Sequence, residues 1–581
     1  MILRFLKRKY PAFSFPVFLF FSSWFLYFTV LWARVFFYDK DGNLCFSAVN
    51  LWRDWNVHFA MGSAMAFRKL FLLSNPLVYG VPFNYPFLCN FLSAVLIRAG
   101  VPFLTAFIVP SYFFSLLLVF ALFTFYKALF RSHSIGMTAS MIFLFNGGMG
   151  FLYFFQDIFA SSSPFSTLLS PPQRYTCLDQ CGIAWVSVID SMVLPQRAFN
   201  HGFPLALLAL AWVWTYFRSP VKRNNQAKGF FNGKRRLLWA GVLLGVMPFI
   251  HTHSFLASCV ILACWLGADL VSPIEMTFKK QWVDWGSFFL ILSIIGLPLV
   301  WILTATHVTQ HHFIRWFPGW LAAENGINWF VFWWRNWGLV PLSAILGFLL
   351  LLSSADGRKQ RLTYFLTFLP FFILFTAINL FIFQPWSWDN TKLLVWASLG
   401  FSGLAAYAIH WLLNAIRVSS FRRLRPFLLP VPMALFVLMV LSGFIDDYRL
   451  LQRRLSIYVM FSKEEFSLAA WVRNHTDPDS TWLSRPTTDQ WLFSLTGRKV
   501  LLTFPATAWT HGYSSAQLEK DIDAMYVSPA SPLFDSYGIE YIVVDKNDKK
   551  QNDLFAAYYP EIHKAGGVVI YKRPLRRAGN S

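Results

Sequence analysis

Residues 362–407 read LTYFLTFLPFFILFTAINLFIFQPWSWDNTKLLVWASLGFSGLAAY, two apolar runs separated by the polar cluster Trp386-Ser-Trp388-Asp389-Asn390-Thr-Lys392. Each run is apolar enough to cross a bilayer, which takes about 20 residues for roughly 30 Å of hydrocarbon. A carboxylate and an ammonium are costly to desolvate at the mouth of a membrane bundle, so their presence indicates a substrate or ion site. The plainer alternative is an interfacial belt in which Asp389 only pairs with Lys392.

The composition of the chain sets its class. It has 581 residues, 56% hydrophobic and 13% charged, with 65 Phe and 26 Trp. The charged fraction is about half that of a typical soluble domain. We therefore predict a mainly α, polytopic transmembrane helix bundle. The chain has 50 Lys and Arg and only 28 Asp and Glu, and the basic residues collect in short loops between apolar segments. This distribution indicates membrane topology and no nucleic-acid partner.

The basic loops thread the chain through the membrane. We predict about eleven spans, or thirteen if every apolar piece between residues 55 and 130 crosses; in the first case residues 55–98 form interfacial helices. The N-terminus is expected in the cytoplasm of a plasma (inner) membrane protein, because positive loops stay inside. The other loops expected inside are 218–236, 279–280, 358–361 and 417–425. The loops expected outside are 156–196, 250–255, 306–328 and 384–390.

A change of composition near residue 446 divides the chain. Residues 1–445 are predicted to form the helical bundle with external loops, and residues 446–581 a soluble α/β domain on the external (periplasmic) side. The domain shows alternating patterns of helix and strand. Helices are predicted at 463–474 and 515–526, and strands at 481–484, 499–503, 541–545 and 568–571. The segment 504–513, with Trp509 and His511, is either a surface loop or a loop that reaches the site.

A carboxylate and a histidine stand one helical turn apart in the first external region, Trp52-Arg53-Asp54-Trp55-Asn56-Val57-His58. A helix places residues i and i+4 on one face, within hydrogen-bonding or shared metal-binding reach. Asp54 is therefore a candidate general base, with His58 beside it. The alternative is an N-capping Asp54 with an unrelated histidine on the same face.

Other polar clusters fall on the predicted outer side. The guanidinium of Arg197 has the paired donors that hold a phosphate. His251 and His253 are two residues apart at a turn, so a metal site there needs an irregular backbone. A bundle that gathers such groups is organised around an anionic ligand. The candidate binding residues are Gln196, Arg197, His201, His251, His253, Arg315, Trp388, Asp389, Asn390 and Lys392, with Thr309-Gln310-His311-His312 preceding Arg315.

Cysteines and metal ligands leave two questions open. Cys177 and Cys181 flank Leu-Asp-Gln in a predicted external loop, where they can form a small disulfide or, with weaker support, bind a metal. The cofactor is unknown, and a divalent metal is compatible with the sequence although no paired-acid metal motif is present.

The arrangement resembles the GT-C class of membrane glycosyltransferases. The residues that carry the resemblance are Asp54 in Arg53-Asp54-Trp55, Tyr85-Pro86 at a helix start, Leu495-Thr-Gly497-Arg498-Lys-Val500, and Tyr541-Ile-Val-Val. The resemblance implies transfer of a sugar from a polyprenyl-phosphate carrier to an acceptor on the outer face of the plasma membrane, in the cell envelope. It implies that Asp54 deprotonates the acceptor, tuned by His58, while Arg197, Arg315 or Lys392 holds the anionic head.

Two other functions are compatible with the same residues. A transporter or flippase for a lipid-linked saccharide would use the basic and histidine residues for binding alone. An assembly protein would use the external domain to bind a partner. Transporters often show internal repeats and polar groups at the bilayer midplane, whereas this sequence has no evident repeat and its polar clusters lie near the predicted outer edge.

Overall fold

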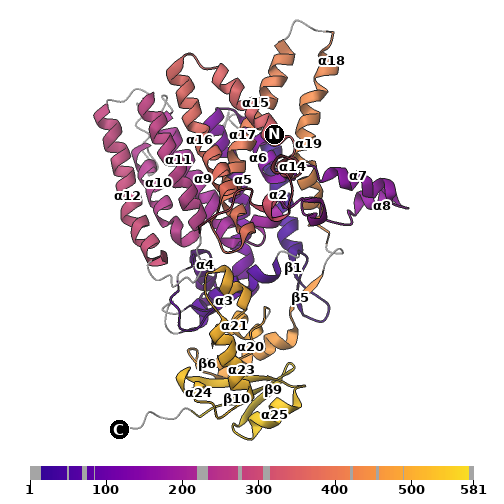
Figure 1. Ribbon diagram of the computed structural model, residues 1–581, viewed down its shortest axis with the longest axis vertical. Coiled ribbons are helices and arrows are strands. Elements are labelled where there is room, and N and C mark those ends of the chain that lie inside the picture. The colour runs from indigo at the N-terminus through magenta and orange to yellow at the C-terminus, as the bar shows by residue number, and fades with distance from the viewer. Residues whose placement is uncertain are drawn as a thin grey trace, which may run out of the picture. The chain divides into compact units, whose positions relative to one another are not determined.

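Figure 1 shows the computed structural model of the protein. The chain divides into two compact units. The described residues are 15–48, 51–68, 75–83, 85–218, 233–272, 278–304, 314–418, 423–452, 457–488 and 490–574. The first unit comprises residues 1–35, 111–301 and 314–455, and the second comprises residues 36–110, 302–313 and 456–581. The predicted domain boundary at 445 and 446 stays a prediction.

The first unit is a bundle of long apolar helices, as the composition predicts (Figure 1). Helix α17 lies at the centre of the bundle, because 89% of its apolar 18-residue stretch is buried. Only 22% of the corresponding stretch of α12 is buried. Small residues let neighbours approach α17 closely. The long helices are α2 (Phe15–Val35), α5 (Phe103–Phe130), α6 (His133–Phe145), α9 (Arg197–Arg218), α10 (Gly233–Ile250), α11 (Thr252–Val271), α12 (Phe278–Thr304), α14 (Trp329–Trp337), α15 (Val340–Ser353), α16 (Arg358–Leu380), α17 (Thr391–Val418) and α19 (Pro430–Arg449).

Fewer helices than expected qualify as membrane spans. By length and composition, seven described helices can cross a bilayer, or eight if α14 and α15, bent by 89°, form one span. Helix α6 has only 13 residues, α10 begins with three basic residues, and α9 begins with Arg197, Asn200 and His201. Polar groups at helix starts therefore account for part of the difference from eleven. The prediction of a mainly α, multi-pass bundle is confirmed.

Short elements connect the long helices of the first unit. Strands β3 (Arg315–Trp316) and β4 (Phe381–Ile382) pair antiparallel. Helices α7 and α8 extend sideways from the other helices of this unit in Figure 1. The remaining elements are α7 (Phe151–Ala160), α8 (Pro164–Leu169), η1 (Asp179–Cys181), η2 (Ile189–Val193), α13 (Leu321–Glu324), η4 (Ser387–Asn390) and α18 (Arg425–Leu428).

Among its described residues, the second unit contains two sheets. One is antiparallel, in the order β1 (Phe36–Tyr38), β2 (Leu44–Phe46) and β5 (Tyr458–Phe461). The other has the order β7-β6-β8-β10-β9, with β6 parallel to β7 and β8, and β10 antiparallel to β8 and β9. Its strands are β6 (Thr481–Leu483), β7 (Lys499–Val500), β8 (Ile539–Asp545), β9 (Glu561–Ala565) and β10 (Val568–Lys572). The helices of the unit are α3 (Leu51–Phe67), α4 (Leu88–Arg98), α20 (Lys463–His475), α21 (Trp491–Thr496), α22 (Pro505–Thr510), α23 (Ala516–Val527), α24 (Leu533–Ser536) and α25 (Lys549–Ala556).

Each helix and strand that was predicted in the C-terminal segment is present. The predicted helices correspond to α20 and α23, and the predicted strands to β6, β7, β8 and β10. Strand β7 ends at Val500, earlier than predicted, and Leu502 instead pairs with Val78 in an isolated bridge. Strand β9 escapes the pattern because its sequence, Glu-Ile-His-Lys-Ala, is largely polar at an edge of the sheet.

Candidate functional site

The loop before α17 is shaped by Asn390. Its side-chain oxygen accepts a hydrogen bond from the backbone N–H of Phe383 at 2.9 Å, and its nitrogen donates to the carbonyl of Phe381 at 2.8 Å. The same nitrogen lies 3.4 Å from the carbonyl of Ile378. Asn390 is nearly fully buried, at 1% exposure. These bonds give Asn390 a structural role in the loop, while its predicted contact with a ligand stays a prediction.

Asp389 and Lys392 form an ion pair across the start of α17. Lys392 Nζ lies 3.1 Å from Asp389 Oδ2, and the two side chains are 13% and 9% exposed. The pair is thus mostly enclosed, and the pairing itself is what the plainer interpretation of this cluster predicts. The N-terminus of a helix also favours anions, because its backbone N–H groups and its dipole carry partial positive charge.

Trp388 and Ser387 join this loop to other segments of the first unit. The indole of Trp388 donates to the carbonyl of Ala184 at 3.3 Å. Trp320 donates to the carbonyl of Ser387 at 2.7 Å, and the Ser387 hydroxyl donates to Glu324 at 2.8 Å. The predicted site residue Trp388 therefore connects the loop 381–392 to the segment that contains Ala184.

The two histidines of the α10–α11 junction face the same loop. His253 Nε2 lies 2.6 Å from Gln384 Nε2, and the rings of His251 and His253 have centroids 5.4 Å apart. His251 is buried, its Nδ1 lies 2.7 Å from Ser254 Oγ, and its backbone is extended, which is the irregularity that the spacing required. Burial lowers the pKa of His251 well below its ordinary value, and the charges of His253 and Lys392 lower it further. His251 is consequently a neutral imidazole near Lys392.

No metal centre accompanies these histidines in the described part of the chain. Among the described residues, no group of three or more His, Cys, Asp or Glu side chains could hold a metal ion. The divalent metal that the sequence left open therefore gains no support from these ligand types.

The cluster at the start of α9 is built into the packing. Arg197 is fully buried, and its Nε donates to Ser111 Oγ at 3.2 Å. His201 Nδ1 lies 2.8 Å from the carbonyl of Arg197, and its ring lies 4.2 Å from that of Phe114. Gln196 is half-buried before the helix. These contacts tie α9 to α5, and the phosphate clamp at Arg197 stays a prediction.

Arg315 lies on a strand beside the same loop. In the register of β3 and β4, Arg315 stands opposite Ile382, and its side chain is exposed. Its guanidinium carbon lies 5.8 Å from the ring centre of Phe317. Strand β4 leads directly into the segment that ends at Lys392. The predicted cluster at 309–312 lies outside the described residues.

Sequence reasoning missed a buried group of carboxylates. Asp446 accepts hydrogen bonds from the backbone N–H of Tyr175, at 2.7 Å, and from the N–H and hydroxyl of Thr176, at 2.7 and 2.6 Å. Asp447 accepts from the hydroxyl of Ser187 at 2.6 Å. The available signal was an Asp-Asp pair directly after an apolar run.

The same region contains a second ion pair. Arg174 Nη1 lies 3.3 Å from Asp190 Oδ2, whose side chain is 2% exposed. With Asp446 and Asp447, this pair fastens residues 174–190 to the C-terminal end of α19. The segment that holds Trp388 is therefore itself rigidly held.

The cysteines of this segment are free. Cys177 and Cys181 are both partly buried thiols, so the small disulfide that their spacing allowed is absent. Burial raises the pKa of the Cys177 thiol to about 11. Cys177 is thus a protonated thiol at neutral pH.

Asp54 and His58 belong to the second unit. Helix α3 forms as predicted and puts both residues on one helix face, with Asp54 in its first turn. Asp54 is half-buried, whereas His58 is 4% exposed. The exposed Arg53 next to them lies over the rings of Trp52, at 4.9 Å, and Phe504, at 5.2 Å. An aromatic and basic surface therefore adjoins the candidate base.

Helix α3 differs from the amphipathic interfacial helix expected for this stretch. Most of its residues are buried, and it packs against α4 and α21 within the second unit. Ser63 donates to the carbonyl of Ser494 at 2.7 Å, and Arg68 donates to the carbonyl of Gly497. Arg68 is thus held in a tertiary contact, and burial lowers its pKa to about 10.

The motif Leu495-Thr-Gly497-Arg498 has a structural function. Gly497 has φ of 68°, and a Cβ there would lie 2.4 Å from the carbonyl oxygen of Ser63, so only glycine fits. Arg498 is buried and donates to Thr476 Oγ1 at 3.0 Å and to the carbonyl of Val472 at 3.2 Å. The motif therefore locks α21 between α3 and the end of α20.

The segment 504–513 is more ordered than a surface loop. It contains α22, and the ring of His511 stacks on that of Tyr85 at 4.3 Å. Burial raises the pKa of Tyr513 to about 12. Its predicted contribution to the site stays a prediction, although Phe504 does contact Arg53.

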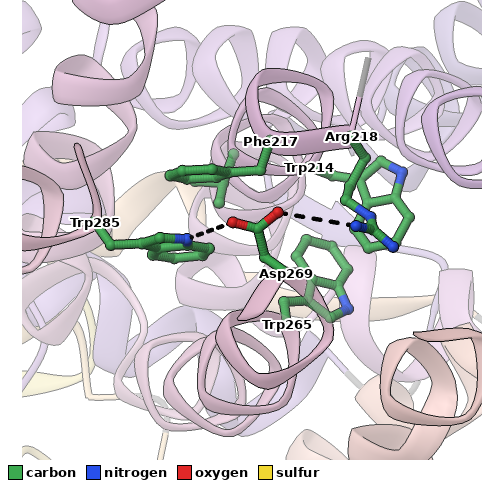
Figure 2. Close-up of a pocket in the computed structure, with 7 residues that line it drawn as sticks. Trp214, Phe217, Arg218, Trp265, Asp269 and Trp285 are labelled. Atoms are coloured by element: carbon green, nitrogen blue, oxygen red, sulfur yellow. Dashed lines mark hydrogen bonds and ion pairs between the residues drawn. The ribbon is translucent and has the colours of Figure 1, made fainter. Parts of the chain in front are cut away.

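The opposite end of α9 holds a closed aromatic pocket, shown in Figure 2. There Arg218 Nη1 lies 3.8 Å from Asp269 Oδ1. The carboxylate also accepts from Gln281 at 2.6 Å and from Trp285 at 3.0 Å. The rings around the pair belong to Trp214, Phe217, Trp265 and Trp285. Because Arg218, Gln281 and Trp285 all bind the Asp269 carboxylate, we assign this pocket a structural role.

Comparison with known proteins identifies the fold. No protein-family profile and no curated protein sequence matches the chain. Among solved structures, the oligosaccharyltransferase of Archaeoglobus fulgidus, with a tethered acceptor peptide containing the NVT sequon, has a TM-score of 0.54 at 10% identity, covering 90% of this chain and 68% of its own.

Two structures of ArnT from Cupriavidus metallidurans, one bound to undecaprenyl phosphate and one apo, have TM-scores of 0.45 at 10% and 12% identity, each covering 96% of this chain and 97% of its own. TM-scores below 0.5 do not establish a common fold, so the likeness that counts is the first. The chain therefore shares the fold of this oligosaccharyltransferase, in agreement with the fold that the resemblance in its sequence implied.

Proposed function

We propose that this chain is a membrane glycosyltransferase that moves a sugar from a polyprenyl-phosphate-linked donor to an acceptor on the outer face of the plasma membrane. The observation that carries the proposal is an enclosed Lys392–Asp389 pair at a helix N-terminus, in a fold shared with an oligosaccharyltransferase. The acceptor tethered to that oligosaccharyltransferase is a peptide.

The anionic head of the donor is assigned to Lys392 and Arg315. Arg315 is exposed and can meet the phosphate first. Lys392 then exchanges its bond with Asp389 for one with the phosphate, in a setting where the backbone N–H groups of α17 also favour an anion. The neutral imidazole of His251 can donate or accept a single hydrogen bond there without adding charge.

Asp54 is assigned the role of general base. The acceptor group attacks the anomeric carbon of the sugar, the bond from that carbon to the phosphate oxygen breaks, and the proton of the acceptor moves to the Asp54 carboxylate. The polyprenyl phosphate leaves with the electron pair of the broken bond. His58 is a positioning residue in this scheme, because it follows Asp54 by one turn of α3.

The decisive experiment replaces Asp54 by Asn, which keeps the shape of the side chain and removes its basicity. We expect Asp54→Asn to bind donor in nanodiscs and to release polyprenyl phosphate about 10²- to 10⁴-fold more slowly, the usual contribution of a positioned base. Mass spectrometry of the released lipid phosphate, with lipid-linked sugars extracted from the native membrane as substrate, measures this without knowledge of the sugar.

Asp41→Asn is the matched control, because Asp41 is an exposed aspartate of the same unit. It should turn over donor like the wild type. Wild-type turnover by Asp54→Asn would remove the base from the proposal. Donor binding by the wild type without any release of lipid phosphate would support the transporter or flippase instead.

A further inference from the structure

Helices α7 and α8 expose an apolar surface that the rest of their unit leaves uncovered. On α7, Leu152, Phe155 and Phe159 recur at i, i+3 and i+7, which is one helix face. All three are exposed, Phe159 to 84%. On α8, Phe165 is 72% exposed, and Leu168 and Leu169 beside it are about half exposed. Figure 1 shows both helices extending away from the other helices of the unit.

The exposed face of α7 continues a face that the protein covers. Phe151 and Phe154, on the adjacent side of the helix, are buried in a cluster with Tyr175 and Ile445. The start of α7 is pressed onto this cluster, since a Cβ on Gly150 would lie 1.7 Å from the carbonyl oxygen of Tyr175. The protein thus covers only part of a wide apolar stripe.

The polar side of α7 is turned elsewhere. Asp157 accepts hydrogen bonds from the hydroxyl of Tyr175 at 2.6 Å and from the side chain of Gln173 at 2.8 Å. Asp157 is also the single charged residue of the sequence 151–169. The exposed apolar face consequently carries no charge with which to recruit a charged partner.

The far end of this pair of helices is fastened where a membrane span ends. Tyr448 donates to the carbonyl of Leu169 at 3.1 Å, Gln452 donates to the same carbonyl at 2.5 Å, and Arg449 donates to the carbonyl of Pro171 at 3.2 Å. These donors stand at the C-terminal end of α19, and the candidate span that contains α19 ends at Arg449.

The outer face of α19 is itself apolar and exposed. Met433 is 61% exposed, Val437 42% and Phe444 52%, at spacings that repeat on one side of the helix. Residues of a candidate span with this exposure face lipid. The apolar face of α7 and α8 therefore begins at the depth where the lipid-facing surface of α19 meets the headgroups.

We propose that α7 and α8 form an interfacial arm, residues 151–169, that inserts into the leaflet at the C-terminal end of α19. Its partner is the boundary between headgroups and acyl chains, which accepts helices with one broad apolar face. Because the arm has no basic residue, it binds zwitterionic and anionic lipids alike. This inference depends on the span of α19 and not on the proposed reaction.

Photocrosslinking tests the arm in the full-length protein. Phe159→p-benzoylphenylalanine and Phe165→p-benzoylphenylalanine keep an aromatic side chain at the two most exposed positions of the arm. Each variant is reconstituted into phosphatidylcholine nanodiscs, irradiated and measured by intact-mass spectrometry. Tyr558→p-benzoylphenylalanine is the control, because Tyr558 is 55% exposed next to α25 in the second unit.

At positions 159 and 165 we expect a mass increase of one phosphatidylcholine. This adduct should be at least about 10-fold more abundant than at position 558, because a solvent-exposed ring meets lipid only in rare encounters. Replacing a third of the lipid by phosphatidylglycerol should leave the total yield unchanged. Crosslinks between two copies of the chain at 159 or 165 would assign the face to a dimer and overturn the proposal. Absence of lipid adducts at both positions, or equal adducts at 558, would overturn it as well.

Discussion

The first unit encloses an ion pair at each of two helix ends, and the two pairs differ in what they connect. Asp269 of α11 takes its donors from other helices, namely Arg218 of α9 and Gln281 and Trp285 of α12. Figure 2 shows this carboxylate closed in by aromatic rings. Asp389 and Lys392, by contrast, pair within a single turn.

The difference separates a structural pair from a functional candidate. A carboxylate that binds donors from two other helices holds three helices together, so its retention in the bundle is explained by the fold. The bond between Asp389 and Lys392 itself joins two residues of one turn, which the backbone already holds close together. Enclosing these charges costs desolvation energy. The proposed binding of the donor phosphate at Lys392 would account for that cost.

The largest effect is expected from Asp269→Ala. It removes the carboxylate that Arg218, Gln281 and Trp285 share in a buried site, which should lower the free energy of unfolding by about 3–5 kcal/mol. Thermal or denaturant unfolding of the purified protein measures the loss. The fraction of folded variant should still bind the lipid-linked donor as the wild type does.

Asp356→Ala is the control for that change, since Asp356 is exposed in the turn before α16. It should leave the unfolding midpoint within experimental error of the wild type. If Asp269→Ala unfolded like the wild type, or lost donor binding while folded, the two ion pairs would no longer be distinguishable by role.

A smaller effect in free energy, but a specific one, is expected from Lys392→Ala. Donor binding should weaken about 10- to 100-fold, the loss of one charge-assisted contact worth about 1.5–3 kcal/mol. Native mass spectrometry of donor bound in nanodiscs measures it. Lys359→Ala is the matched control, because Lys359 is an exposed lysine at the start of α16. This variant should bind donor like the wild type.

Asp389→Asn sharpens the same comparison, because donor binding should not weaken in this variant. It removes the negative charge that pairs with Lys392, so donor should bind as tightly as in the wild type or more tightly. Weaker binding by Asp389→Asn, together with a collapse of stability in Lys392→Ala, would make this pair structural like the one at Asp269.

The smallest effect concerns Cys177, in the segment that is fastened to α19. Because burial raises the thiol pKa to about 11, the thiolate fraction rises with pH and is only about one in 10⁴ at pH 7. Alkylation of Cys177 in the folded protein should therefore be slow and should accelerate about tenfold per pH unit between pH 7 and 9.

Peptide mapping after alkylation identifies the labelled cysteine, and Cys177→Ser removes the signal. Fast labelling of Cys177 at pH 7, or a disulfide between Cys177 and Cys181 in the peptide map, would mean that residues 174–190 are held less firmly than the bonds of Asp446 indicate.

The sequence was most informative about single elements. The C-terminal helices and strands follow from their periodicity, because side chains that repeat every 3.6 or 2 residues define one buried face. The helix over Asp54 and His58 and the pairing of Asp389 with Lys392 follow from local spacing. Position in a helix is a local property, so a short stretch of sequence suffices for each.

Long-range contacts were beyond that reasoning. Nothing near Asp446 in the sequence indicates that it receives three hydrogen bonds from Tyr175 and Thr176, about 270 residues earlier. Likewise, nothing near Arg68 in the sequence indicates that it donates to the carbonyl of Gly497. Burial of such groups depends on which segments meet, which no local pattern encodes.

By itself, the sequence determined that the protein is a mainly helical, multi-pass membrane protein and which polar residue types lie between its apolar segments. This follows because the free energy of transfer into lipid adds up along the chain. Only the tertiary structure decided the surroundings of each charge. It enclosed Asp269 with donors from two helices, paired Lys392 with Asp389, and left Phe159 exposed on α7. The physical reason is that the cost of burying a charge or exposing a ring depends on what surrounds it, and distant segments supply those surroundings.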